Sequence, residues 1–312
     1  MTTLTTDFDV ADLPRSVLIG LMGTGVTPSL SPPMHELEGA RHGMHYVYRA
    51  VDLAADETSP AQLSVLLAFA RTLGFNGLNI THPVKQTVVP LLDELAPSAA
   101  MVGAVNTVVF DNDRMVGHNT DVTGFGGALD MAFPDSQRAH VVLVGAGGAG
   151  SAVACALATR VESLTIVDID ETRARALAAH VGTKCPAHVE AASADSLPRL
   201  LAAADGVVNA TPFGMVDHPG TSFNPELLSS DAWVADIVYR PVETDLLVAA
   251  RERGCRVMSG LGMAMRQAAD SFEIFTGESA DRDAMLNDLR NLVTAEAAGT
   301  YTPVALKRGK NR

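Results

Sequence analysis

The sequence has few aromatic residues, few cysteines and no long apolar run, and each shortage excludes a class of protein. Aromatic residues make up 5% of the 312 residues against a hydrophobic content of 47%, which is typical of an α/β interior rich in Ala, Val and Leu. The three cysteines, Cys155, Cys185 and Cys255, lie far apart and form no CxxC pair. This argues against a disulfide framework and favours a reducing, cytoplasmic compartment. No apolar run reaches the roughly 18 residues that a membrane-spanning helix needs.

Positive charge is also scarce. The 23 Lys and Arg residues are outnumbered by 36 Asp and Glu residues, which gives a net charge of -13 and a pI near 5.0. Nucleic acid and anionic membranes are therefore not expected as main partners, whereas a small anionic substrate could still be held by local groups. The N-terminus lacks the basic-then-apolar pattern of a signal peptide, and residues 1–14 and 302–312 are expected to be disordered tails.

The most informative stretch lies near the middle of the chain. An apolar run, Val141–Val144, leads into a G-x-G-x-x-G turn over Gly145–Gly150 and a small apolar segment, Ser151–Thr159. A second apolar run, Leu164–Val167, then ends at Asp168. Strand, glycine turn, helix, strand and terminal acid in a unit of about 30 residues are typical of a dinucleotide-binding fold, with a purely structural turn as the alternative.

Each part of this stretch has a physical role in binding a dinucleotide. Gly145 permits a tight turn, Gly147 lets the backbone approach a pyrophosphate, and Gly150 allows close packing of helix on sheet. The N-terminus of the helix offers unpaired N–H groups and a positive dipole to the phosphates. Asp168 is placed to accept hydrogen bonds from the adenosine ribose.

Strands and helices alternate on both sides of the glycine turn. Before it, strands are predicted at Ser16–Leu21, His45–Val51, Asn76–Ile80, Gly103–Phe110 and Met115–His118, with helices from about Met34 and at Ala61–Leu73, Pro83–Leu95 and Val122–Ala132. After it, strands are predicted at Ser163–Asp168, Cys185–Val189, Gly206–Asn209, Trp233–Val238 and Arg256–Met258, with helices at Thr172–Val181, Leu246–Arg253, Ala264–Thr276 and Arg282–Ala297.

This pattern predicts an α/β protein with two domains and a cleft between them. An N-terminal α/β substrate domain would cover residues 15–121 and be completed by C-terminal helices over residues 264–298. A Rossmann-type domain with a doubly wound parallel sheet would cover residues 122–263. The chain is long enough for two substantial cores.

Lys85 stands two residues after Pro83, at the predicted start of a helix. Proline suits the first turn of a helix, and the positive end of the helix dipole disfavours an ammonium ion there, as suits a group that hands over a proton. A solvated surface lysine is the alternative. Asp121 stands at the start of the next predicted helix and could be either its N-cap or a functional carboxylate.

Hydroxyl and amide side chains stand out in two further places. Ser29 and Ser31 are two residues apart, so in an extended segment both hydroxyls would face one ligand, although serines in such loops are often turn formers. Asn106 and Thr107 interrupt an apolar run and must find partners or face a cleft. No Cys/His cluster has zinc-ligand spacing, so no metal is expected, and oxidation of an alcohol would need a side chain as its proton shuttle. A lysine paired with a carboxylate can fill that role.

Taken in order, these motifs resemble the shikimate dehydrogenase family, and within it the NAD-dependent quinate/shikimate dehydrogenases. The resemblance covers roughly Ser16 to Gly277. Besides the glycine turn, the matching motifs are Ser29-x-Ser31 with Pro32 and His35, Asn79-x-Thr81-x-Pro83-x-Lys85, Ala104-Val-Asn106-Thr107, Gly117-x-Asn119-Thr120-Asp121-x-x-Gly124-Phe125, Asn209-Ala-Thr211-Pro-x-Gly214-Met215, Tyr239-x-Pro241-x-x-Thr244-x-Leu246-Leu247 and Gly260-x-x-Met263-x-x-x-Gln267-Ala268.

The resemblance implies a role for each matching position. Lys85 and Asp121 would be the catalytic pair, with Lys85 handling the proton of the reacting hydroxyl. The ring hydroxyls and carboxylate of the substrate would be held by Ser29, Ser31, Thr81, Asn106 and Gln267, with Tyr239 closing the site. The pyrophosphate would lie against Gly145, Gly147, Gly148 and Ala149, the adenosine ribose against Asp168, and the nicotinamide half near Thr211, Met215, Gly262 and Met263.

The residues after the second strand of the dinucleotide unit favour NAD over NADP. NADP-dependent members of the family usually carry an Asn-Arg-Thr type sequence there, whose arginine can clamp the 2′-phosphate. This chain has Asp168-Ile169-Asp170, in which a carboxylate would repel that phosphate and no cation replaces the arginine. Arg173 and Arg175 are close in sequence and leave some use of NADP open.

The resemblance thus implies reversible NAD-dependent oxidation of shikimate, and also of quinate, to 3-dehydroshikimate and 3-dehydroquinate. Ser31 fits the shikimate pattern, whereas the rest of its loop looks more like the quinate/shikimate subgroup. Ser259 departs from the family's frequent Asp, so one polar contact near the cleft is left open. The alternatives are a biosynthetic NADPH-dependent shikimate dehydrogenase, an aminoshikimate dehydrogenase, and a nucleotide-sensing protein that kept the fold without the chemistry. The acidic surface fits a monomer or a homodimer.

Overall fold

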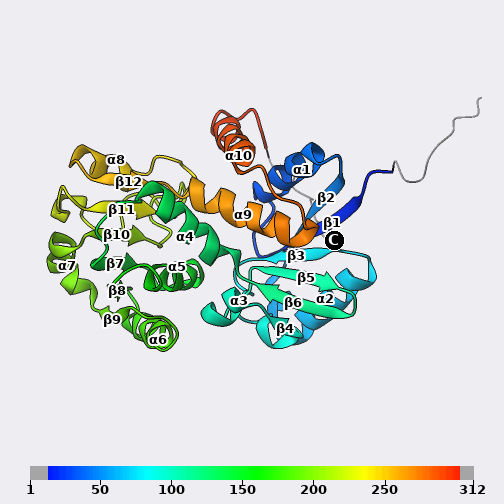
Figure 1. The fold of residues 1–312 in the computed structure, drawn as a ribbon, viewed down its shortest axis with the longest axis horizontal. Helices are drawn as coiled ribbons and strands as arrows, with labels where there is room; N and C mark the ends of the chain where they lie inside the picture. The colour runs from blue at the N-terminus through cyan, green and yellow to red at the C-terminus, as the bar shows by residue number, and fades with distance from the viewer. Residues whose placement is uncertain (1–12, 303–312) are drawn as a thin grey trace, which may run out of the picture.

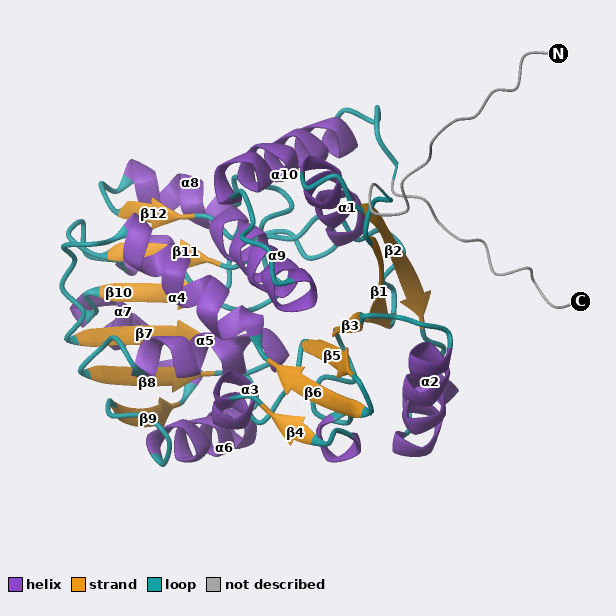
Figure 2. Ribbon diagram, turned by 45° about the vertical axis from the view of Figure 1, so that its right-hand side comes forward, coloured by secondary structure: helices purple, strands orange, loops and turns teal. Residues whose placement is uncertain are grey.

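Two six-stranded sheets form the framework, one in each of two lobes (Figures 1 and 2). The structure, a computed structural model, describes residues 13–302, so the expected tails lie almost entirely outside the described residues. The first lobe contains strands β1 (Ser16–Gly23), β2 (His45–Asp52), β3 (Gly77–Ile80), β4 (Glu94–Leu95), β5 (Thr107–Asp111) and β6 (Arg114–His118), with helices α1 (Ser31–Arg41), α2 (Pro60–Thr72), α3 (Pro97–Val102) and α10 (Arg282–Ala297).

The second lobe is a continuous stretch of the chain. It contains strands β7 (His140–Val144), β8 (Ser163–Val167), β9 (His188–Ala192), β10 (Gly206–Asn209), β11 (Trp233–Asp236) and β12 (Arg256–Met258), with helices α5 (Gly148–Ala158), α6 (Glu171–Gly182), α7 (Leu197–Ala203) and α8 (Asp245–Glu252). Two further helices, α4 (Thr120–Ala132) and α9 (Leu261–Thr276), run between the lobes (Figure 1).

The sheet of the first lobe is mixed, with strand order β2-β1-β3-β5-β6-β4. Strand β1 pairs in parallel with both β2 and β3, whereas β5 pairs antiparallel with β3 and β6. Because β1 and β3 are parallel neighbours, with Met22 opposite Ile80, their carboxyl ends meet at one edge of the sheet. The loop that carries the two serines and the segment that carries Lys85 therefore start side by side.

The sheet of the second lobe is entirely parallel, with strand order β12-β11-β10-β7-β8-β9. Its inner strands are largely buried apolar runs such as Val141–Val144, as expected where helices cover both faces of a sheet. The chain moves outward from β7 in one direction to β9, and then in the other direction from β10 to β12. The carboxyl ends of β7 and β10 thus form the switch point at which open α/β sheets bind ligands. The predicted α/β class with a doubly wound parallel sheet is confirmed.

Helices α4 and α9 lie side by side across the junction of the lobes (Figures 1 and 2). They approach so closely at Gly124 that a Cβ atom there would lie 2.8 Å from the backbone nitrogen of Gln267. Further along α9, Phe272 and Phe275 pack against the first sheet, and Met285 of α10 belongs to the same core cluster as residues of α1. The end of the described chain therefore completes the core of the first lobe.

The predicted helix Pro83–Leu95 is wrong. The segment forms a series of turns, a short 3₁₀ turn at Val89–Leu91 and strand β4. Neighbouring strands and loops take the carbonyl groups that a helix would use: Val105 N–H donates to the Lys85 carbonyl at 2.8 Å, and Thr24 N–H donates to the His82 carbonyl at 2.9 Å. Tertiary hydrogen bonds therefore outweigh the local signal of the proline.

Two strands begin later than predicted, and two helices, α3 and α7, were not predicted. The strand expected at Gly103–Phe110 starts at Thr107, because Gly103 is the C-cap of α3 with a φ of 72° and residues 104–106 form a connection between α3 and the strand. The strand expected at Cys185–Val189 is β9, shifted toward the C-terminus. Helix α7 lies before β10 and was not predicted from the sequence. Between residues 13 and 302, no helix is both long and apolar enough to cross a membrane.

Candidate active site

Lys85 and Asp121 are in direct contact although they come from different elements. Lys85 follows β3, and Asp121 lies in the first turn of α4. The Lys85 Nζ atom lies 2.6 Å from Asp121 Oδ2, and the two side chains are only 19% and 10% exposed. Such a charge-assisted hydrogen bond fixes the direction of the ammonium group.

The surroundings of this pair differ from the expectation in two ways. Lys85 is not in a helix, so the carboxylate of Asp121, and not a helix dipole, is the group that orients its ammonium. Asn119 is the N-cap of α4, because its Oδ1 accepts hydrogen bonds from the backbone N–H groups of Asp121 and Val122. The carboxylate of Asp121 is therefore free from the capping role that was its alternative.

Asn106 holds the second oxygen of this carboxylate. Its side chain is 3% exposed, and its Nδ2 donates to Asp121 Oδ1 at 3.1 Å and to Thr120 Oγ1 at 2.9 Å. Its Oδ1 accepts from the backbone N–H of Thr120 at 2.8 Å. Asp121 therefore has one oxygen on Lys85 and the other on Asn106, which leaves its carboxylate little freedom to rotate.

Two other predicted substrate residues are Thr81, which precedes Lys85 in the chain, and Gln267, which lies on α9 where this helix meets α4. Thr81 follows β3 and packs so tightly on Gly23 that a Cβ atom there would lie 2.4 Å from the Thr81 methyl carbon. Gln267 lies on α9 where it meets Gly124 of α4, one turn from Asp121. Its Nε2 donates to the Ala264 carbonyl at 3.0 Å.

The two serines and Tyr239 form a separate group. Ser31 is the first residue of α1, and its backbone N–H donates to Ser29 Oγ at 3.2 Å. Burial raises the pKa of the Tyr239 phenol, so this group stays neutral. The next residue, Arg240, donates to the Pro28 carbonyl at 3.0 Å and pairs with Glu296 of α10. This arginine links the Tyr239 segment of the second lobe to the serine loop of the first.

The glycine turn has the geometry of a phosphate cradle. Gly145 has a φ of 109°, which L side chains rarely adopt, and a Cβ atom on Gly150 would lie 2.2 Å from the Gly145 carbonyl oxygen. In contrast, a Cβ atom on Gly147 or Gly148 would meet no described protein atom within 4 Å. Gly147 is also the N-cap of α5 and supplies no side-chain bond to its N–H groups. The turn, which continues through Ala149, thus leaves open space and unpaired donors at a helix N-terminus, as an anion requires.

Asp168 lies at the carboxyl end of β8 and is 9% exposed. Its Oδ2 accepts from the Ala146 N–H at 2.7 Å, and its Oδ1 accepts from the Asp170 N–H at 2.9 Å. The same carboxylate is 3.4 Å from Arg173, whereas the side chain of Ile169 is 91% exposed. Asp168 therefore also fixes the glycine turn, a role that the sequence analysis did not assign to it.

Buried hydrogen bonds shape the loop that follows β10. Asn209 Nδ2 donates to Asp236 Oδ1 at 2.8 Å, and Asn209 Oδ1 accepts from both the N–H and the hydroxyl of Thr211. Burial raises the pKa of Asp236, opposed by hydrogen bonds from Thr244, Val238 and Asn209. The loop ends at Gly214, which has a φ of 101°, and at Met215, which is 43% exposed. These contacts place the loop at the switch point beside the glycine turn.

The remaining predicted cofactor residues lie at the start of α9. Gly262 faces α4, where a Cβ atom would lie 3.2 Å from the Ala128 methyl carbon, and Met263 is 8% exposed. Within residues 13–302, no group of three or more His, Cys, Asp or Glu side chains is placed to hold a metal ion.

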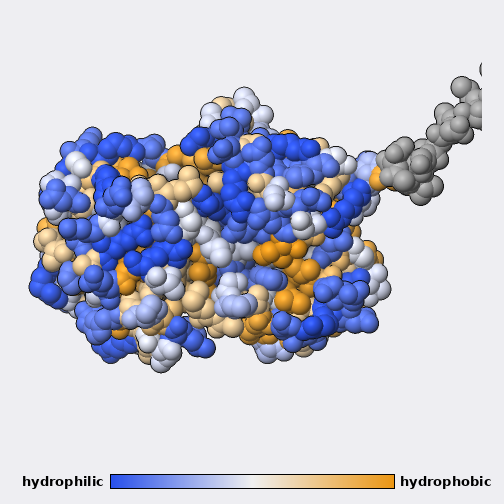
Figure 3. All heavy atoms as spheres, in the orientation of Figure 1, coloured by the Kyte–Doolittle hydropathy of each residue, from blue (hydrophilic) through white to orange (hydrophobic). Residues whose placement is uncertain are grey.

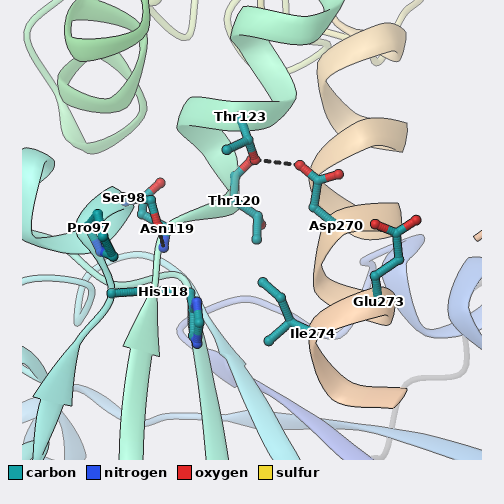
Figure 4. A pocket seen from close by; sticks show the side chains of 10 residues that line it. Pro97, Ser98, His118, Asn119, Thr120, Thr123, Asp270, Glu273 and Ile274 are labelled. Atoms are coloured by element: carbon teal, nitrogen blue, oxygen red, sulfur yellow. Dashed lines mark hydrogen bonds between the residues drawn. The ribbon is translucent and has the colours of Figure 1, made fainter. Parts of the chain in front are cut away.

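A separate hollow of about 570 Å³ lies on another face of α4 and α9. Figure 4 shows Thr123 of α4 donating a hydrogen bond to Asp270 of α9, with His118 and Ile274 on the wall below. In Figure 3, apolar atoms gather on this side of the first lobe, over the region of β5 and β6. Neither Lys85 nor Asp121 is among the residues that line the hollow, but Asn119 and Thr120, which precede Asp121, are, so the hollow lies next to the site described above.

Three side chains to which no role was assigned from the sequence are hydrogen-bonded to Asn106 or Thr120. Asn79, Thr107 and Ser271 are buried and hydrogen-bonded to one another. The first two were visible as polar residues inside apolar strands. Ser271 was not distinguished, because one small polar residue on the buried face of a helix is a weak signal.

Comparison with known proteins identifies the family of the chain. Three family profiles match the chain: the shikimate dehydrogenase substrate binding domain over residues 21–108, shikimate/quinate 5-dehydrogenase over residues 128–214, and the shikimate 5'-dehydrogenase C-terminal domain over residues 260–290. Together they span both lobes and the helices between them.

Two curated relatives are equally similar but differ in the cofactor of their names. A shikimate dehydrogenase (NADP(+)) from Pseudarthrobacter chlorophenolicus is 50% identical over 284 residues, which cover 90% of this chain and 97% of the relative. A quinate/shikimate dehydrogenase (NAD(+)) from Corynebacterium efficiens is 50% identical over 273 residues, which cover 86% of this chain and 96% of the relative.

A solved structure extends the likeness to the whole fold. The quinate dehydrogenase from Corynebacterium glutamicum in complex with NAD superposes with a TM-score of 0.85 at 47% identity. The match covers 89% of this chain and 100% of that one. On the strength of these matches, the chain belongs to the shikimate dehydrogenase family.

Proposed function

We propose that this chain catalyses the reversible NAD-dependent oxidation of shikimate, and also of quinate, to the corresponding 3-dehydro acid. The observation that carries the proposal is the contact between Lys85 and Asp121, 2.6 Å long and largely shielded from water at the junction of the lobes. Oxidation of a ring alcohol requires a group that takes up the hydroxyl proton as the carbonyl forms. A lysine held by a carboxylate is suited to that task.

In this mechanism Lys85 is the proton-transfer residue and Asp121 is its partner. In oxidation Lys85 acts as the neutral amine, whose Nζ takes up the proton of the reacting hydroxyl and becomes the ammonium; in reduction the ammonium returns that proton to the oxygen. Asp121 balances the charge of the ammonium and keeps it pointing in one direction, while Asn106 holds the other carboxylate oxygen. The carbinol carbon gives up a hydride, and accepting it is the chemistry that a bound nicotinamide would supply.

The substrate would be held mainly by the first lobe. We assign its ring hydroxyls and carboxylate to Ser29, Ser31, Thr81 and Gln267, with Tyr239 closing the site from the second lobe. Asn106, which was predicted to share this task, can bind the substrate only by giving up one of its hydrogen bonds to Thr120 and Asp121. All of these are neutral polar groups, which can bind a polyhydroxylated acid through hydrogen bonds with defined directions. The neutral phenol of Tyr239 fits the same scheme.

The dinucleotide would be held by the second lobe, and the residues present fit it. The open space beside Gly147 and Gly148, together with the unpaired N–H groups that lead into α5, suits a pyrophosphate over Gly145–Ala149. Thr211 and Met215 from the loop after β10, and Gly262 and Met263 from α9, would contact the nicotinamide half. Asp168 would accept hydrogen bonds from the adenosine ribose.

The preference for NAD rests on residues 168–170. A 2′-phosphate near Asp168 would meet a carboxylate in a mostly buried position, where charge repulsion is poorly screened. Ile169 offers no cation, and Arg173 is already within 3.4 Å of Asp168 and 3.2 Å of Asp170. The alternative is a biosynthetic enzyme that prefers NADPH, for which Arg173 would have to leave both carboxylates.

The experiment measures initial rates of NAD and NADP reduction with shikimate and with quinate, in all four combinations. We expect turnover of both acids with NAD and a much lower kcat/KM with NADP. Equal or higher efficiency with NADP would overturn the cofactor assignment and support the biosynthetic enzyme. Absence of turnover in all four combinations, with NAD still bound, would overturn the substrate assignment.

A further inference from the structure

Ser271 is a fully buried hydroxyl on α9, one of the two helices that run between the lobes. Its side chain is 0% exposed, yet its Oγ lies within hydrogen-bond distance of groups from four different parts of the chain. These are the Gln267 carbonyl at 2.8 Å, Asn79 Nδ2 at 3.1 Å, Thr107 Oγ1 at 3.0 Å and Thr120 Oγ1 at 3.1 Å. The serine thus joins α9 to β3, β5 and the first turn of α4.

Counting protons fixes the direction of these bonds around Ser271. A hydroxyl has one proton to donate and two lone pairs that accept. The Gln267 carbonyl can only accept, so the proton of Ser271 is used there. Ser271 therefore accepts from Asn79 Nδ2, which can only donate, and its second lone pair is left for Thr120, because the proton of Thr107 is used on Asn106 Oδ1.

The same count of protons determines the direction of the hydrogen bonds that Thr120 makes. Thr120 Oγ1 accepts from Asn106 Nδ2 at 2.9 Å, so its own proton is free to point to Ser271. Thr120 is 2% exposed, and water cannot readily replace Ser271 as the acceptor of this proton. Without Ser271, Thr120 would have to turn its hydroxyl elsewhere and withdraw the acceptor that Asn106 uses.

Asn106 is the link between this chain of bonds and the proposed catalytic pair. Its Oδ1 is occupied by the backbone N–H of Thr120 at 2.8 Å and by the Thr107 hydroxyl at 3.0 Å. Its amide nitrogen must therefore face Thr120 Oγ1 and Asp121 Oδ1. The orientation of this amide, and with it the carboxylate of Asp121, depends on both threonines keeping their present hydrogen bonds.

We propose that Ser271 is a positioning residue that holds Asn106, and through it Asp121 and Lys85, in the arrangement needed for proton transfer. This inference rests on the proposed function, because it concerns how the same pair is aligned. Ser271 touches neither member of the pair, so its effect is transmitted through Thr120 and Asn106. Since it sits on α9, four residues after Gln267, it also couples the helix that carries a proposed substrate contact to the proton-transfer group.

The test compares Ser271→Ala and Ser271→Cys with a matched control on the same helix. Thr276 is also buried on α9, and its hydroxyl also donates to the carbonyl four residues earlier, Phe272, at 2.8 Å, but it has no contact with Asn106, Thr107 or Thr120. Thr276→Val thus removes a comparable hydroxyl outside the network. For each protein, kcat and KM for shikimate, the Kd of NAD and the melting temperature are measured.

We expect both Ser271 variants to lose kcat by about tenfold, with the KM for shikimate and the Kd of NAD changed by less than about twofold. Cysteine fills the volume of serine but is a weak hydrogen-bond partner, so a loss in both variants identifies the hydrogen bonds and not the cavity as the cause. Thr276→Val should keep the wild-type kcat. If Ser271→Ala does not fold, Ser271→Cys carries the comparison.

Either of two results would overturn the inference. One is a wild-type kcat in Ser271→Cys, which would leave Ser271 only a packing role. The other is an equal loss of kcat in Thr276→Val, which would mean that any buried hydroxyl on α9 has the same effect. A wild-type protein that turns over neither shikimate nor quinate would instead refute the proposed function, so the two failures are distinguishable.

Discussion

The proposed site of the first lobe is built from side chains, whereas that of the second lobe is built mainly from backbone. In the first lobe, Lys85, Asp121 and Asn106 are each held by hydrogen bonds to other side chains. In the second lobe, the cradle consists of Gly147 and Gly148 with open space around them, and Asp168 is held by backbone N–H groups. Proton transfer needs a functional group at a fixed point, while a pyrophosphate needs only donors and room.

This difference predicts how substitutions act in each lobe. A buried polar side chain that loses its partner leaves an unsatisfied group, so changes in the first lobe affect neighbouring side chains as well. A glycine in the turn of the second lobe matters because it has no side chain. A methyl group added there either points into open space and leaves the fold intact, or clashes with backbone atoms. The following variants test this contrast, beginning with the largest expected effect.

Replacing the proton-transfer group should have the largest effect. We expect Lys85→Met to lower kcat with shikimate by roughly 10² to 10⁴-fold, because the hydroxyl proton then has no positioned acceptor. The Kd of NAD, measured by titration, should not change, because Lys85 lies in the first lobe. Lys184→Met, a change of an exposed lysine in the second lobe, is the control. Near-normal turnover by Lys85→Met would show that another group transfers the proton.

Two alanine substitutions in the glycine turn should separate binding from folding. Gly147→Ala adds a methyl group where no described protein atom lies within 4 Å, so we expect normal thermal stability but an NAD Kd raised about tenfold, or roughly 1.4 kcal/mol. Gly150→Ala places a methyl group against the Gly145 carbonyl and should destabilise the fold by roughly 1–3 kcal/mol. If Gly147→Ala bound NAD as tightly as the wild type, the pyrophosphate would not lie over this turn.

A cation beside Asp168 should weaken the cofactor preference. Ile169 is 91% exposed, so Ile169→Arg can supply a positive charge without disturbing the bonds that Asp168 makes to backbone. We expect kcat/KM with NADP to rise about tenfold, because the introduced arginine can form one charge-assisted hydrogen bond to the 2′-phosphate. Ile169→Gln, which has no charge, is the control, and an equal gain in that variant would contradict the electrostatic explanation.

The smallest effect is expected at the contact that joins the lobes at the serine loop. Arg240→Met removes the donor to the Pro28 carbonyl and the ion pair with Glu296, so the serine loop becomes less ordered. We expect the KM for shikimate to rise about threefold with little change in kcat, as for the loss of one partly exposed hydrogen bond. Arg251→Met, which breaks an exposed pair with Glu243, should leave both parameters unchanged. A fall in kcat alone would place Arg240 with the proton-transfer group instead.

The second lobe was the more predictable of the two. Val141–Val144, the glycine turn and Asp168 occur within one short stretch, so local pattern and tertiary structure agree there. The segment after Pro83 was not predictable in the same way, because the carbonyl of Lys85 bonds to Val105, twenty positions away in the sequence. Long-range bonds of this kind leave no periodic signal in the chain.

The contact between Lys85 and Asp121 could be expected from the sequence, whereas the hydrogen bonds that surround it could not. Motif spacing identified Lys85 and Asp121, and the structure brings them into contact. Nothing in the sequence indicated that Asp168 also anchors the glycine turn, or that Ser271 meets Thr120. Such contacts depend on how side chains from separate elements meet, which only the folded structure defines.

The first lobe takes its strands from the start of the chain and part of its core from the end, where Phe272 and Phe275 pack against β1 and β2. A ribosome releases the second lobe as one uninterrupted segment, which can fold once β12 has emerged. The core of the first lobe cannot be completed until α9 and α10 have also emerged. A nascent chain therefore acquires its dinucleotide fold before its site is complete, and a product truncated after β12 would retain the glycine turn but lack Gln267 and Ser271.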